Sequence, residues 1–146
     1  MSDRSRNLGQ IVMGLNRAQQ KLTLQINQAL APFGLNMTRL TLLSRFTAQP
    51  NRSRNVSNIV QATGMNQPTV TKVVSQLIEQ QWLVIEPDLT DARKKALRIT
   101  PDGLGIVIQA YGKLTQELAD LFSGYDDREI AELLESVVRL NENLET

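Results

Sequence analysis

The spacing of apolar residues between positions 56 and 77 constrains this 146-residue chain more than any other feature. Two short stripes recur at the three- and four-residue intervals of an amphipathic helix. Their members are Val56, Ile59 and Val60 in the first stripe, and Val70, Val73, Val74 and Leu77 in the second. Gly64 suits a turn with positive φ, while Asn66 and Pro68 are typical of a helix N-cap and first turn. The pattern predicts two helices, residues 56–63 and 67–81, joined by a tight turn.

The second predicted helix carries polar groups on the face opposite its apolar stripe. Those side chains are Gln67, Thr69, Thr71, Lys72, Ser75 and Gln76. Their amides, hydroxyls and amine have the reach to contact base edges and phosphates in a major groove. We expect Gln67 to pair with adenine and the threonine methyl groups to contact thymine. Lys72 would hold a phosphate, together with Arg52 and Arg54 from the polar loop before the first helix. The pattern favours a helix-turn-helix that reads DNA.

A β-hairpin with a basic tip is predicted directly after these helices. Residues 82–85 are apolar, residues 96–100 alternate between apolar and polar, and the residues between them are polar and turn-like. A hairpin in this place is the wing of a winged helix-turn-helix, which we assign to residues 36–100. The predicted DNA contacts are Arg52, Arg54, Asn66, Gln67, Thr69, Thr71, Lys72, Ser75, Gln76, Arg93, Lys94 and Lys95.

The charges of the chain are unevenly distributed. Residues 37–100 hold nine basic and four acidic side chains, whereas the whole chain has a formal net charge of +1. A basic middle between acidic ends fits a DNA-binding lobe on a scaffold that does not touch DNA. The sequence contains no cysteine and no histidine, which excludes disulfides, thiolate metal sites and the commonest general base. We therefore expect no metal, no cofactor and no enzymatic activity, since no nucleophile has a partner base.

Amphipathic helices are predicted at both ends of the chain, over residues 8–31, 101–124 and 126–146. Pro32 and Gly34 end the first of them, and Asn36 caps a short helix that follows. The terminal helices exceed what one small core needs, so we expect their apolar stripes to pack against a second copy of the chain. The fold class is mainly α with a small β-hairpin wing. We predict one domain over residues 1–146, with the lobe at 36–100 and a helical dimerisation region at 1–35 and 101–146.

Residues 36–103 resemble the MarR family of bacterial transcriptional regulators. The most specific part is the wing, where Asp91 and Arg93 match an Asp-x-Arg pattern near the tip and residues 97–103 match a strand that closes in Leu-Thr-x-x-Gly. The resemblance implies a homodimeric repressor of pseudo-palindromic operators that a small effector releases from DNA. It also implies that Arg93 enters a minor groove while Asp91 braces the wing.

Two positions depart from the family pattern. Gln81 stands where the family usually has glycine, which would strain the backbone by about 1 kcal/mol if that residue needs positive φ. Ile85 stands at the base of the wing where the family often has arginine, so one phosphate contact would be missing.

The resemblance further implies a small aromatic or anionic effector bound between the helical scaffold and the DNA-binding lobe. The residues that would line such a site are Arg17, Met37, Arg39, Phe46 and Tyr111. For each of them, core packing or a solvated surface position stays open as the simpler interpretation.

Two other functions stay open from the sequence: a winged helix that contacts proteins, and a constitutive DNA-binding protein without an effector. The N-terminal residues have the pattern of neither a signal peptide nor a membrane span, so we expect a cytoplasmic protein.

Overall fold

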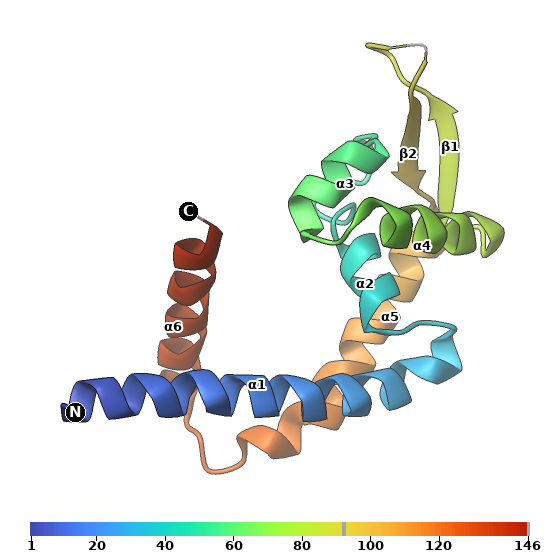
Figure 1. Ribbon diagram of the computed structural model, residues 1–146. Coiled ribbons are helices and arrows are strands. Elements are labelled where there is room, and N and C mark those ends of the chain that lie inside the picture. Colours follow the sequence, from blue (N-terminus) through green and yellow to red (C-terminus); the bar gives the residue numbers. More distant parts are fainter. Residues whose placement is uncertain (92, 146) are drawn as a thin grey trace. The chain divides into compact units, whose positions relative to one another are not determined.

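The predicted helix-turn-helix and wing are both present in a computed structural model of the chain, which describes residues 1–91 and 93–145 (Figure 1). The elements in chain order are α1 (Asp3–Leu30), the 3-10 helix η1 (Ala31–Phe33), α2 (Met37–Ser44), α3 (Val56–Thr63), α4 (Gln67–Glu79), β1 (Leu83–Pro87), β2 (Lys95–Ile99), α5 (Pro101–Leu118), the 3-10 helix η2 (Ala119–Phe122) and α6 (Asp127–Glu145). The chain divides into two compact units, residues 1–114 and 115–146. The predicted fold class, mainly α with a small β-hairpin wing, is confirmed.

Helix boundaries follow the capping residues closely. Asn36, Asn55 and Asn66 cap α2, α3 and α4, each accepting a hydrogen bond from a backbone N–H in the first turn. Gly64 ends α3 at φ +70°, the left-handed conformation that its lack of a Cβ permits. The prediction was wrong about the start of α1, which begins at Asp3 because the Ser2 hydroxyl accepts from the Ser5 N–H at 3.1 Å. It was also wrong about α5, whose last turn before residue 124 is the separate helix η2.

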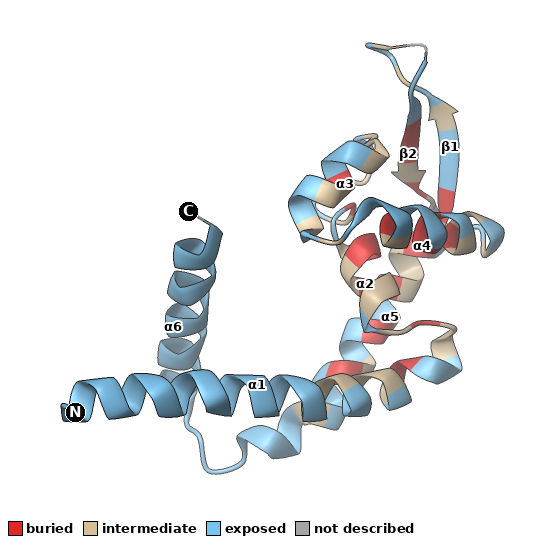
Figure 2. Ribbon diagram, in the orientation of Figure 1, coloured by how far each residue is buried: buried red, intermediate tan, exposed pale blue. Residues whose placement is uncertain are grey.

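The core of the first unit lies between α2, α3, α4 and the two strands. Figure 2 shows that buried residues gather in this lobe, while the N-terminal part of α1 is exposed. The largest fully buried side chains are Phe46, Leu30, Leu42, Leu43, Ile59, Leu77, Leu83 and Val70. The stripes read from the sequence are therefore the packing faces of α3 and α4. No helix among the described residues is long and apolar enough to cross a membrane.

The wing is an antiparallel pair in which Leu83 faces Ile99 and Pro87 faces Lys95. A third segment joins its edge, because the N–H and carbonyl of Arg54 pair with Leu97 at 2.8 and 2.7 Å. No pattern in the sequence indicates this bridge, since residues 48–54 have only the composition of a polar loop. The bridge ties the loop before α3 to the wing.

Thr100 and Gly103 join the wing to α5. The Thr100 hydroxyl donates to the Gln81 carbonyl at 2.7 Å and accepts from the Gly103 N–H at 3.0 Å. The Thr100 N–H donates to the Trp82 carbonyl at 3.0 Å. A Cβ at Gly103 would collide with that same carbonyl and with the Ile99 side chain. The Thr-x-x-Gly pattern thus has a physical cause, a close approach of α5 to the end of the α4–β1 turn.

Gln81 adopts the left-handed backbone conformation, which is costly for any residue other than glycine. Its φ is +64°, and it is the only non-glycine residue with positive φ among those the structure describes. Its N–H donates to the Ile78 carbonyl, and the Trp82 N–H donates to the Leu77 carbonyl, both at 2.9 Å. This is the two-bond ending of a helix that glycine usually provides. With Gln81 in place of glycine, both hydrogen bonds of the turn still form, and the backbone of Gln81 is strained.

We expect Gln81→Gly to raise the free energy of unfolding by about 0.5–1 kcal/mol, because glycine removes the clash of a Cβ in the left-handed region. Urea denaturation followed by circular dichroism measures the change. Ser75→Gly is the matched control, since Ser75 is exposed inside α4 and glycine there should lower stability by about 0.5 kcal/mol. A loss of stability in both variants would contradict the strain assigned to Gln81.

Candidate nucleic-acid interface

The exposed face of α4 is the first part of the candidate interface. Gln67, Pro68, Thr71, Lys72 and Ser75 are all exposed and together border an open hollow of about 530 Å³. The Asn66 side-chain oxygen accepts from the Thr69 N–H at 2.9 Å, and Asn66 is itself exposed. The N-terminal turns of α4 therefore present amide, hydroxyl and ammonium groups on one accessible surface.

Gln76, also predicted as a DNA contact, is less accessible than these residues and does not border the hollow. It lies one turn of helix after Lys72, at the edge of the exposed polar face. Its side chain is half-buried, and its Oε1 accepts from Arg39 Nε at 3.2 Å. Thr69 is also half-buried, between the two faces. Both residues therefore lie at the edges of the exposed face and not at its centre.

The wing tip is organised by two aspartates. Asp91 Oδ1 accepts from the backbone N–H of Arg93 at 3.0 Å and lies 3.6 Å from Arg93 Nε. The Arg93 side chain is 93% exposed, so this contact orients the arginine without covering it. Lys94 and Lys95 are exposed beside it. Ala92, between the two motif residues, lies outside the described residues.

Asp88 holds the start of the tip, a role that was not predicted from the sequence. Its Oδ1 accepts from the Thr90 hydroxyl at 2.7 Å, the Thr90 N–H at 2.8 Å and the Asp91 N–H at 3.3 Å. The hydroxyl of Thr90 and then its backbone N–H hold the pKa of Asp88 below its ordinary value. The available signal was the Asp-x-Thr spacing, which favours a side-chain turn of this kind.

The two arginines before α3 differ in environment. Arg52 is exposed and donates to the Gln49 side chain at 3.2 Å, so its guanidinium stays accessible. Arg54 is half-buried by the bridge to Leu97, and its Nε is buried with no hydrogen-bond partner among the described residues. Arg52 is thus the better placed of the two for a phosphate, and Arg54 supports the wing through its backbone.

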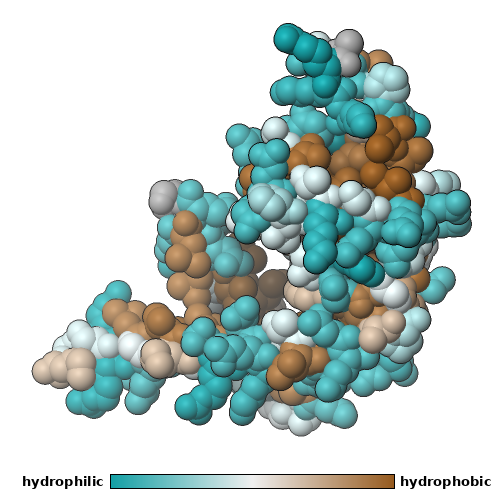
Figure 3. Space-filling view, turned by 45° about the vertical axis from the view of Figure 1, so that its right-hand side comes forward, coloured by the Kyte–Doolittle hydropathy of each residue, from teal (hydrophilic) through white to brown (hydrophobic). Residues whose placement is uncertain are grey.

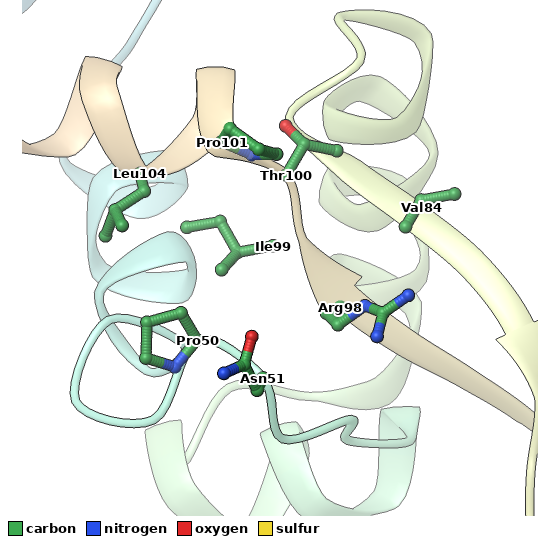
Figure 4. Close-up of a pocket in the computed structure, with 8 residues that line it drawn as sticks. All are labelled: Pro50, Asn51, Val84, Arg98, Ile99, Thr100, Pro101 and Leu104. Carbon is green, nitrogen blue, oxygen red and sulfur yellow. The ribbon is translucent and has the colours of Figure 1, made fainter.

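A second hollow lies at the base of the wing (Figure 4). It measures about 530 Å³ and is bordered by Pro50, Asn51, Val84, Arg98, Ile99, Thr100, Pro101 and Leu104. Arg98 forms an ion pair with Glu86 at 2.8 Å across the two strands. Ile85, where an arginine was noted as missing, is exposed on β1.

A third hollow contains part of the predicted effector site. It measures about 360 Å³ and is bordered by Ile26, Met37, Leu40, Thr41, Ser44, Arg45, Tyr111 and Leu114. The hydroxyls of Ser44 and Tyr111 lie 3.1 Å apart at its edge. Met37 and Tyr111 were predicted from the sequence, whereas Arg45, the cation in this lining, was missed.

The other three residues predicted for the effector site do not border this hollow. Phe46 is fully buried in the core. Arg39 turns toward α4, where it contacts Gln76. Arg17 is exposed and borders a separate shallow hollow along α1.

We expect the amide proton of Thr90 to titrate with a midpoint below pH 3.8, the ordinary pKa of an aspartate. Because the folded-state pKa is lowered, the order that Asp88 gives the tip is complete above the ordinary value and is lost as pH falls through the lowered one. Proton–nitrogen correlation spectra across an acid titration measure it. The titration should vanish in Asp88→Asn, and a midpoint at or above 3.8 would contradict the assigned contacts.

Solved structures of other proteins share the fold of this chain. No protein-family model matches the sequence. BldR, a transcriptional regulator from Sulfolobus solfataricus, superposes with a TM-score of 0.84 at 18% identity, over 98% of this chain and 99% of that one. A mutant of MarR from E. coli, in complex with operator DNA, superposes with a TM-score of 0.77 at 16% identity, over 95% of this chain and 99% of that one.

BpsR from Bordetella bronchiseptica, whose DNA binding is regulated by 6-hydroxynicotinic acid, superposes with a TM-score of 0.75 at 23% identity, over 90% of this chain and 98% of that one. These structures span almost the whole chain, including the helices at both ends. The chain has the fold of the MarR-family transcriptional regulators.

Proposed function

We propose that this protein is a dimeric transcriptional regulator of the MarR type that reads DNA with α4 and the wing. The observation that carries the proposal is the exposed polar face of α4, with Gln67, Thr71 and Lys72 grouped on one accessible surface. An N-capped helix with such a face is what a major groove accommodates. In this proposal residues 36–100 form the DNA-binding lobe, and residues 1–35 and 101–146 form the dimerisation region.

The contacts divide by chemistry. Gln67 and Thr71 lie near the N-terminal end of α4, the end that reaches base edges first, and supply amide and methyl groups for adenine and thymine. Lys72 and Arg52 are exposed cations suited to phosphates. Arg93, oriented by Asp91, would enter the adjacent minor groove, where a narrow A·T-rich stretch attracts a guanidinium.

A second copy of the chain is the partner that suits the terminal helices. Leu8, Ile11, Val12 and Leu15 are exposed along α1, and α6 exposes Ile130, Leu133, Leu134, Val137, Val138, Leu140 and Leu144. Figure 3 shows hydrophobic atoms at the surface of both helices. Contiguous apolar stripes of this extent mark interaction surfaces. Two copies would place two copies of α4 in successive major grooves, about 34 Å apart.

The hollow lined by Met37, Arg45 and Tyr111 supports control by a small effector. Its lining is mostly apolar, with one guanidinium and several hydroxyls, which suits an aromatic acid. BpsR, similar in fold, is regulated by 6-hydroxynicotinic acid, an aromatic acid. A ligand that binds more tightly to a conformation unable to fit the operator would lower DNA affinity by that difference.

We expect the wild-type protein to select a preferred duplex from a random-sequence pool and to bind it far more tightly than the pool itself. Fluorescence anisotropy at several salt concentrations measures both affinities. Lys72→Gln should reduce the slope of log K against log salt by about 0.9 for each lost phosphate contact. Lys21→Gln on α1 removes the same charge outside the interface and should leave the slope unchanged.

Three outcomes of that assay separate the candidate functions. Failure to bind any duplex even at low salt would overturn the DNA-reading proposal and leave the winged helix as a protein-contact module. Selective binding that 6-hydroxynicotinate or benzoate weakens supports an effector-controlled regulator. Selective binding that is unchanged by a panel of aromatic acids favours a constitutive DNA-binding protein.

We expect Val137→Glu to raise the dissociation constant of the dimer by at least about tenfold, because it places an unpaired charge in the apolar stripe of α6. A two-fold interface would contain the change twice. Sedimentation equilibrium measures the constant, with Ser136→Glu as the control that adds the same charge at the edge of the stripe. A wild-type protein that stays monomeric at high concentration would contradict the dimer.

A further inference from the structure

Arg39 links three elements of the first unit at one point. It projects from α2, and its Nε donates to Gln76 Oε1 on α4 at 3.2 Å. Its Nη1 donates to the backbone carbonyl of Gly34, in the turn that follows η1, at 2.8 Å. The side chain is half-buried, so these bonds are shielded in part from competing water. A charged donor with two neutral acceptors makes hydrogen bonds stronger than the average.

The same turn contacts α4 a second time. The Gly34 carbonyl also accepts from Gln80 Nε2 at 3.2 Å. Gln76 and Gln80 are one helical turn apart, so both contacts lie on the same side of α4. Gly34 has φ +73°, and a Cβ there would come within 3.0 Å of Gln80 Nε2 and 3.4 Å of the Trp82 ring. The turn therefore lies close against the C-terminal half of α4, beside the exposed polar face.

The contacts of Arg39 do not fit a role in ligand or DNA binding. It is absent from the lining of the hollow that contains Met37 and Tyr111. It is also absent from the hollow along the exposed face of α4. Its guanidinium is committed to atoms of the protein, through a glutamine that the sequence suggested for base contact.

We propose that Arg39 is a positioning residue that fixes α4 against the α1–α2 turn and so sets how accurately the helix reads bases. The inference rests on the proposed function, since it assigns a role within that interface. Base-edge hydrogen bonds require the helix to be placed to within a fraction of an ångström, whereas phosphate attraction tolerates larger displacements. Loss of the Arg39 contacts should therefore reduce sequence discrimination and leave the electrostatic part of binding intact.

The first test needs no DNA. Hydrogen exchange of the purified protein, followed by mass spectrometry of peptides that cover residues 76–82, compares wild type with Arg39→Gln. We expect exchange in this segment to become about tenfold faster, since hydrogen bonds from a charged donor are lost. Arg4→Gln, at the exposed start of α1, is the control and should change nothing there. Unchanged exchange in Arg39→Gln would overturn the proposed fixation of α4.

The second test measures DNA binding with the duplex that the wild-type protein selects and with the random pool. Arg39→Gln should weaken binding to the selected duplex about tenfold while leaving affinity for the pool and the salt slope unchanged. Arg39→Lys keeps the charge but cannot reproduce both bonds, so it should behave like Arg39→Gln. A reduced salt slope would make Arg39 a phosphate contact and overturn the positioning role.

The third test is a double-mutant cycle, which measures the DNA affinity of Gln76→Leu, of Arg39→Gln and of the double variant. If both residues act through one contact, the double variant should be weaker than either single variant by much less than the product of their effects. Independent, multiplicative losses would overturn the inference, because Gln76 would then contribute on its own. If the wild-type protein selects no duplex, the proposed function fails, and the exchange experiment still decides whether Arg39 fixes α4.

Discussion

The helix and the wing that form the candidate interface both depend on one junction, at which Thr100 donates to the carbonyls of Gln81 and Trp82. These two carbonyls follow the end of α4, while Thr100 follows β2 and caps α5. The junction therefore fixes the angle between α4 and the hairpin in a few closely spaced residues. It requires a left-handed residue at position 81 and no Cβ at position 103. Position 103 is a glycine, but position 81 is a glutamine. The left-handed conformation is therefore kept at Gln81 although it strains the backbone.

Local sequence was sufficient to predict most of the fold because each signal acts within a few residues. Asn36, Asn66 and Gly64 define helix ends through their own side chains or their lack of one. The bridge between Arg54 and Leu97 was beyond such reasoning, because it joins backbone groups far apart in the chain and leaves no mark on composition. The early start of α1 was missed for a different reason: its first turns carry polar residues, and a cap at Ser2 supports them.

The candidate site was predictable in outline and less so in detail. Exposed positions of α4 followed from helical periodicity, but the contact of Gln76 with Arg39 at the edge of that face did not. Asp88 escaped notice because its role is to accept hydrogen bonds from Thr90 and Asp91, a task that only the folded turn reveals. The hollow beside α2 is bordered by Arg45 and not by Arg39, because the direction of a long side chain is set by its tertiary partners. Whether these residues act on DNA or an effector stays a prediction.

Helix α6 has no buried residue in the structure, although apolar residues recur along it at helical spacing. Most of the stability of a helix in a protein comes from the packing of its apolar face, so α6 without a partner would be weakly stable. A chain whose partner is missing would then leave its C-terminal segment open to cellular proteases, while a paired chain would be protected. Under that arrangement the lifetime of each molecule would rise with the number of copies in the cell. A regulator built in this way would have a turnover rate that depends on its own abundance.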